Sequence, residues 1–273
     1  MKRDLAGPLT TLEFQGYEIA FHSHARAILE IDFPEALDEL SEVLTTLTIP
    51  IEEIVASGGG EAKGTQRLRR GLAGKNWTKT RFDIRKTINN VQREAISHEV
   101  DHVRSFPDAG EVALEIEWNN KDPFFDRDLE NFKRLHSESA ISVGIIVTRG
   151  TALQDQMKEL VSRFVIERNI NSFEDLEPYH VAPTKRQREA VQRRIGRRRN
   201  PMTFREAWTD HFVNDKYGAA TTHWRKLKDR VRRGVGNPCP LLLIGLPPSI
   251  VTFNEGPRVL EEVLEEDSFT AAD

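Results

Sequence analysis

The sequence predicts an α/β fold, with a central β-sheet and helices packed against it. Residues 141–148 (ISVGIIVT) and 240–246 (PLLLIGL) are continuous apolar runs. Such runs are typical of strands that are buried on both faces of a sheet. Amphipathic helical patterns at residues 122–135 and 153–166 alternate with the strands. Alternating strands and helices indicate a sheet covered by helices.

The N-terminal region is expected to supply one strand and three helices. Residues 17–29 predict a strand that runs into a short helix. Asp32 is the expected cap of the next helix, which has Pro34 in its first turn and leucines at helical spacing. The glycines at 58–60 break the chain, and residues 65–73 predict a short basic helix.

A β-hairpin is expected in the middle of the chain. Residues 99–106 and 112–118 alternate as strands, and Pro107-Asp108-Ala109-Gly110 between them has strong turn chemistry. The helix that follows is expected to have Asp122 as its N-cap and Pro123 at its first position.

Charge is distributed unevenly along the 273 residues, although the net charge is only −4. Residues 185–199 (KRQREAVQRRIGRRR) contain eight Lys or Arg and one acid. We expect one domain over residues 1–273, with a basic helical insertion at 169–212 and an acidic C-terminal tail at 255–273. A basic island on a mildly acidic protein predicts a local contact with a polyanion.

Three classes of protein are disfavoured by composition. The single Cys239 allows no internal disulfide and no zinc cluster, and its apolar neighbours predict a core thiol. No apolar run approaches the roughly 18 residues of a membrane span. The N-terminus lacks the apolar segment of a signal peptide, so we expect a soluble, cytoplasmic protein with no membrane contact.

Acidic residues form the most informative pattern. Glu115 and Glu117 lie two positions apart in a predicted strand, so they share one face at roughly 6–7 Å. If Asp101 lies on a neighbouring strand, three carboxylates converge, and a divalent cation is the commonest reason for that. Glu61 is a further candidate outer ligand. The alternative is that these glutamates form the solvated face of an amphipathic strand.

Polar and basic residues predict contacts with nucleic acid. Asn119, Asn120 and Lys121 follow the acidic strand; amides suit adenine edges and lysine suits phosphate, although a plain polar turn is the alternative. The basic segment predicts phosphate contacts, with a solvated helix as the alternative. Its candidate residues are Arg193, Arg194, Arg197 and Arg198.

Ordered blocks of the chain resemble the BglII-like type II restriction endonucleases, relatives of BamHI and BstYI. The resemblance rests on GEVALEIEWNNKDPFFDRDLENF, ISVGIIVTRG and TTHWRKLKDRVRRGVGNPCPLLLIGL, with GTQRLRRGLAGKNW and RFDI upstream. It spans residues 60–246, interrupted by the basic insertion.

The resemblance implies a restriction-endonuclease-like fold of the PD-(D/E)xK type, a mixed β-sheet flanked by helices. It also implies a homodimer that uses Mg²⁺ to cut double-stranded palindromic DNA, with a GATC core and 5′-phosphate products. A host of such an enzyme needs a matching DNA methyltransferase as a functional partner.

Residue by residue, the resemblance places Asp101 as the first metal ligand, with Asp108 as a competitor, and Glu115 as the second. Glu117 stands where most of the superfamily has lysine, and its expected role is to orient or deprotonate water or to help hold a second ion. The amides at 119 and 120 fall where the family contacts bases. Thr221 and Thr222 fall near a second recognition loop.

Two other functions fit parts of the pattern. A catalytically silent DNA-binding protein would share the fold and bind DNA without turnover. A hydrolase with paired carboxylates and no metal, such as a glycosidase, would act in EDTA. The intact acidic residues disfavour the first alternative, and the basic segment disfavours the second.

Overall fold

The computed structural model describes residues 7–57 and 62–253, which divide into two compact units. The first unit is Met1–Leu47, Arg67–Thr151 and Thr222–Pro247; the second is Thr48–Gln66, Ala152–Thr221 and Pro248–Asp273. The acidic tail at 255–273, the glycine break at 58–60 and Glu61 lie outside the described residues. The predicted single domain with an insertion at 169–212 stays a prediction.

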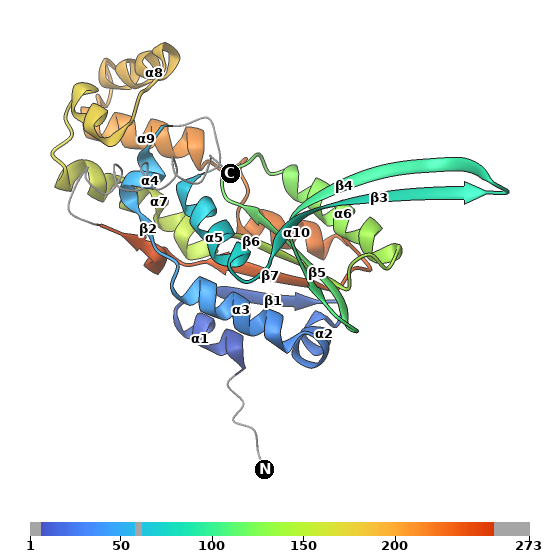
Figure 1. Cartoon of the computed structure of the whole chain (residues 1–273). Coiled ribbons are helices and arrows are strands. Elements are labelled where there is room, and N and C mark those ends of the chain that lie inside the picture. The colour runs from blue at the N-terminus through green and yellow to red at the C-terminus, as the bar shows by residue number, and fades with distance from the viewer. Residues whose placement is uncertain (1–6, 58–61, 254–273) are drawn as a thin grey trace, which may run out of the picture. The chain divides into compact units, whose positions relative to one another are not determined.

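Within the described part of the first unit, six strands form one mixed sheet in the order β1-β7-β6-β5-β4-β3 (Figure 1). Strands β5, β6 and β7 are parallel, whereas β1, β4 and β3 join by antiparallel pairing. The predicted α/β architecture is confirmed. The strands are β1 (Glu18–His22), β3 (Thr78–Ile88), β4 (Val91–Phe106), β5 (Gly110–Glu117), β6 (Val143–Arg149) and β7 (Leu241–Leu246).

Helices cover both faces of this sheet. On one face α6 contacts β5 and β6, and α10 packs on α6. On the other face Arg104 of β4 pairs with Glu39 of α3 (3.1 Å), and α2 contacts β6 and β7. The helices of the first unit are α1 (Pro8–Phe14), α2 (Ala25–Asp32), α3 (Pro34–Thr45), α6 (Phe124–Ser137) and α10 (Trp224–Arg232); α5 (Lys63–Ala73) begins in the second unit and ends in the first.

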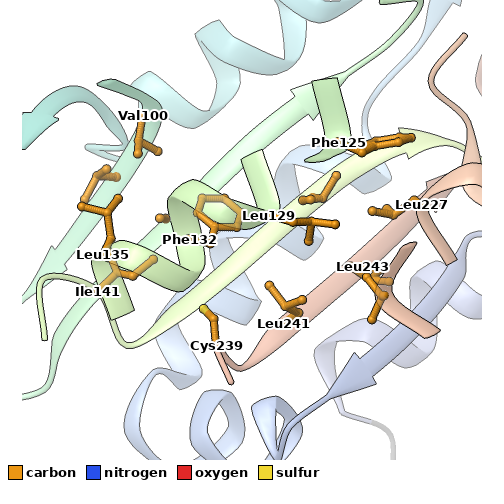
Figure 2. Close-up of a cluster of buried hydrophobic side chains, with 14 of the residues drawn as sticks. Val100, Phe125, Leu129, Phe132, Leu135, Ile141, Leu227, Cys239, Leu241 and Leu243 are labelled. Atoms are coloured by element: carbon orange, nitrogen blue, oxygen red, sulfur yellow. The ribbon is translucent and has the colours of Figure 1, made fainter. Parts of the chain in front are cut away.

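A hydrophobic core lies between the sheet and α6 (Figure 2). Cys239 is fully buried in it, as predicted. Gly144 of β6 allows α6 to approach closely, because a Cβ there would lie 2.4 Å from the Phe132 ring. The close packing fixes α6 against the sheet face that carries the acidic residues of β5.

The β3–β4 pair extends past the rest of the sheet as a two-stranded arm (Figure 1). Strand β4 begins at Val91, earlier than the predicted residue 99. Asn89 and Asn90 both have positive φ (50° and 62°), as hairpin turns of the I′ type require. The arm was only partly predicted, although Phe82 and Ile84 of β3 alternate with polar residues and pack against the core.

Two predicted helix caps are wrong. Asp32 is the last residue of α2, and Phe33 occupies the N-cap position of α3. Pro123 is at the N-cap position of α6, and the Asp122 carboxylate instead lies 3.1 Å from Lys226 Nζ. A tertiary ion pair therefore replaced the expected local cap.

The second unit is mainly helical among its described residues. The basic segment forms α8, whose N-cap Thr184 makes a capping box with Gln187. No described helix has the length and apolar character needed to cross a membrane. Its elements are β2 (Ile49–Pro50), α4 (Ile51–Val55), α7 (Thr151–Glu167), η1 (Glu174–Tyr179), α8 (Lys185–Ile195), α9 (Phe204–Lys216), η2 (Pro248–Ile250) and β8 (Val251–Thr252).

Candidate active site

Three of the predicted acidic residues converge on the sheet face that α6 covers. Antiparallel pairing of β4 and β5 places His102 opposite Leu114. One residue further along each strand, away from the hairpin turn, Asp101 therefore lies opposite Glu115. The Asp101 backbone N–H donates to Glu115 Oε1 (3.4 Å). Glu117 follows on the same face of β5.

Asp108 is distant from this convergence. It lies in the turn between β4 and β5, with φ of 69°. Strand pairing places Phe106, at the turn end of the hairpin, opposite Gly110, several residue pairs away from Glu115. The geometry therefore favours Asp101 over Asp108 as the residue that acts beside Glu115.

The solvated-strand alternative is wrong. Glu115 is only 6% exposed and Glu117 only 2% exposed. Asp101, in contrast, keeps more than half of its side chain exposed. The acidic side chains on β5 are thus buried, whereas the one on β4 is open to solvent.

A fourth carboxylate, Asp128 of α6, joins this site and was missed by sequence reasoning. It is 1% exposed, and its charge acts on both Glu115 and Glu117. The signal was present in the sequence, because residue 128 lies on the apolar face of α6 with Phe125 and Leu129. An acid on the buried face of a helix needs a polar or cationic partner. The acid cluster hereafter means Asp101, Glu115, Glu117 and Asp128.

The buried acids favour their neutral forms. Burial raises the pKa of Glu115 well above its usual range, and the charges of Asp128 and Asp101 raise it further. Burial also raises the pKa of Glu117 to about 8, with the Asp128 charge as the second cause. Burial raises the pKa of Asp128 as well. Full ionisation of the cluster would therefore bring in more negative charge than its surroundings stabilise.

Cations lie at the edge of the acid cluster. Arg127 Nη2 lies 2.8 Å from Asp128 Oδ1 and 3.6 Å from Glu117 Oε1. The Arg127 side chain is 55% exposed, so its guanidinium borders solvent. Lys79 Nζ lies 3.9 Å from Asp101 Oδ1 and pairs more closely with a neighbouring glutamate. Arg127 thus supplies positive charge beside Glu117 at the edge of the acid cluster.

The acid cluster fits Mg²⁺ by the type of its donors. Its carboxylate oxygens are the ligands that this ion prefers. Buried Asp128 Oδ2 has no hydrogen-bond donor among the described residues unless Glu117 carries a proton. Within residues 7–57 and 62–253, however, no three acidic, histidine or cysteine side chains form a ready-made metal-binding group. The carboxylate groups of the acid cluster would therefore have to move closer together to bind an ion.

The polar residues after β5 lie beside the acid cluster. Asn120 Nδ2 donates to Glu117 Oε2 (2.9 Å), which links the first predicted base-contacting segment to a cluster carboxylate. Asn119 is half-buried, and Lys121 is exposed. Their predicted contacts with DNA stay predictions.

Thr221 and Thr222 have little access to solvent. Thr222 is fully buried, and Thr221 Oγ1 donates to Gly218 O (2.7 Å). A hydroxyl contact with DNA would require this segment to rearrange. The backbone of Thr222 is more informative, because its N–H donates to Asn120 O (2.8 Å).

The basic residues of the second unit differ in availability. Arg193, Arg197 and Arg198 are exposed. Arg194 is engaged on its own unit, since its Nε lies 3.3 Å from Asp210 Oδ2. Three of the four predicted arginines therefore present their guanidinium groups to solvent.

Comparison with known proteins gives one family match. A model of the restriction endonucleases BglII/BglIII matches residues 17–246, most of the chain. That range includes the whole acid cluster, the six-stranded sheet and α8. The search of curated proteins returns no significant match.

Proposed function

The chain belongs to the restriction endonuclease family of BglII/BglIII, and we propose that it is a type II site-specific deoxyribonuclease. Its substrate would be double-stranded, palindromic DNA, and its products would carry 5′-phosphates. The observation that carries this proposal is the convergence of Asp101, Glu115 and Glu117 on one sheet face beside the buried Asp128.

Asp101 and Glu115 are the residues that would hold Mg²⁺. Asp101 is the exposed member and would face incoming substrate, whereas Glu115 is buried. When bound, the ion would act as a Lewis acid on the scissile phosphate and lower the pKa of a coordinated water. One or two carboxylates with the phosphate are enough for Mg²⁺, which keeps several waters.

Glu117 and Arg127 would together replace the lysine that most of the superfamily has at this position. Glu117 would act on the attacking water, and Arg127 would supply the positive charge. Glu117 in its ionised form can accept a proton from the attacking water or orient it, with Asn120 fixing one of its oxygens. Arg127 sits next to that carboxylate at the exposed edge, where its guanidinium can face a phosphate. Asp128 holds Arg127 in that place.

Sequence selection would need two protomers. A symmetric dimer reads a palindrome, since each protomer contacts an equivalent half-site. Asn119 and Asn120 would contact bases and Lys121 a phosphate, and the family favours a GATC core. A DNA methyltransferase in the same host would protect the host's own copies of the site.

The test is cleavage of unmethylated bacteriophage DNA by the purified protein, with Mg²⁺ or with EDTA. Discrete bands with Mg²⁺ alone are expected, and sequencing their ends gives the site and the cut position. Intact DNA together with a salt-sensitive gel shift would instead indicate a silent binding protein. Equal cleavage in EDTA would exclude the metal-dependent chemistry.

The exposed arginines of α8 and the residues just after it should set the salt dependence of DNA binding. Replacing Arg193, Arg197 and Arg198 by alanine removes up to three phosphate contacts. The slope of log affinity against log salt should then fall by up to about 0.9 per lost contact, nearly equally for all DNA sequences. Fluorescence anisotropy with specific and random duplexes measures both slopes.

A matched triple variant controls for the loss of charge alone. Arg26 and Arg163 are also largely exposed, Lys133 is partly exposed, and all three lie on other helices. Their replacement by alanine should change the slope much less. Equal slopes for the two triple variants would mean that the basic segment is only a solvated surface.

A further inference from the structure

Arg149 is the last residue of β6 and has no solvent exposure, which is rare for an arginine. Its Nε donates to Trp118 O (2.7 Å), and its Nη2 donates to Thr222 O (2.6 Å). Burial of a guanidinium has a large desolvation cost, which well-formed hydrogen bonds only offset. The side chain therefore fixes two distant backbone segments at a position where burial of an apolar residue would cost less free energy.

Both segments fixed by Arg149 adjoin residues of the proposed DNA-cutting site. Trp118 directly follows Glu117, the last residue of β5. The Thr222 N–H donates to Asn120 O, and Asn120 Nδ2 donates to Glu117 Oε2. These bonds form a closed chain from Arg149 through Thr222 and Asn120 to Glu117, and back through the backbone of β5.

We infer that Arg149 is a positioning residue that couples recognition of the DNA sequence to cleavage. The inference rests on the proposed function. Arg149 itself is buried and would not touch substrate. It keeps Asn120, Glu117 and Thr222 in fixed positions relative to one another. The guanidinium fork is planar and rigid, so a shift of either segment is transmitted to the other. Displacements of about 1 Å at reacting groups are enough to lower a rate substantially.

Arg149→Met tests this role, because methionine refills much of the space and makes neither hydrogen bond. We expect its cleavage rate to fall about tenfold to a hundredfold at the cognate site. The ratio of rates at cognate sites and at sites with one changed base should fall at least about tenfold, while DNA affinity changes little. Arg149→Lys keeps the charge and fewer donors, and should be intermediate.

Arg104→Met is the matched control. Arg104 is a mostly buried arginine on the opposite sheet face, where it pairs with Glu39. Its loss should reduce thermal stability and leave the cognate-to-noncognate ratio unchanged. All rates are compared per folded molecule, with the folded fraction taken from circular dichroism melts. If Arg149→Met does not fold, Arg149→Lys is used as the test variant.

An unchanged ratio in folded Arg149→Met or Arg149→Lys would overturn the inference, as would an equal fall in Arg104→Met. These results differ from failure of the proposed function. In that case the wild-type protein itself would cut no DNA with Mg²⁺, before any variant is compared.

Discussion

Replacement of Glu115 by glutamine should abolish DNA cleavage, lowering the rate at least about a thousandfold. Glutamine has nearly the same shape but lacks the negative charge that would hold Mg²⁺. The variant should remain folded, because glutamine is neutral, as is the form of Glu115 that burial and the charges of Asp128 and Asp101 favour. DNA binding in EDTA should be kept, since the metal-free protein favours a neutral Glu115 and glutamine adds no charge.

Single-turnover cleavage, gel shift and thermal melting together check this prediction. Glu130→Gln is the control, because Glu130 is a partly exposed acid of α6 that pairs with Lys133. It should cut at the wild-type rate. A Glu115→Gln protein that cuts within tenfold of wild type would remove Glu115 from the proposed mechanism.

The same assay distinguishes the two candidates for the first metal ligand. Asp101→Asn should lose cleavage much as Glu115→Gln does, because Asp101 lies opposite Glu115. Asp108→Asn should stay near wild type, since residue 108 lies in the hairpin turn. The reverse outcome would mean that the β4–β5 hairpin rearranges on binding DNA.

The sheet core was predictable because its strands have patterns that few other structures share. The apolar runs that became β6 and β7 have every side chain buried. The convergence of Asp101 with Glu115 followed from two rules, the two-residue period of strands and a hairpin turn at residues 107–110. Each rule needs only neighbours in the sequence.

Features that depend on distant partners were not predictable. Asp122 looks like a helix cap, yet it pairs with Lys226, about a hundred positions away. Arg149 bonds to carbonyls 31 and 73 positions away, and nothing in its local sequence indicates this. Asp128 is a different case, since its place on the apolar face of a helix can be read from the local sequence. Tertiary electrostatics decided all three positions.

The acid cluster should also make the metal-free protein less stable as pH rises. Burial raises the pKa of Glu117 from 4.5 to about 8, so the folded state holds this proton more tightly than the unfolded state does. The resulting stabilisation is fully present below about pH 4.5 and is lost as pH rises to about 8. Each pKa unit represents roughly 1.4 kcal/mol, and we expect Glu117 to contribute about 2 kcal/mol of this loss.

The measurement is the free energy of unfolding in EDTA at pH 5.5 and pH 8.5, for wild type and Glu117→Gln. Glutamine cannot ionise, so the variant should gain stability relative to wild type by about 2 kcal/mol across this range. Histidines and other groups titrate in both proteins, and their effects cancel in the difference. Glu130→Gln should follow the wild-type profile, and parallel profiles for wild type and Glu117→Gln would contradict the prediction.

Mg²⁺ extends the same experiment to the proposed function. A cation that binds the ionised acid cluster stabilises the folded state, and it must displace any proton held there. The midpoint of thermal unfolding of wild type should therefore rise more on adding Mg²⁺ at pH 8.5 than at pH 5.5. The rise should be smaller in Glu115→Gln. A rise that is independent of pH and equal in both proteins would place Mg²⁺ outside the acid cluster, even if DNA cleavage requires it.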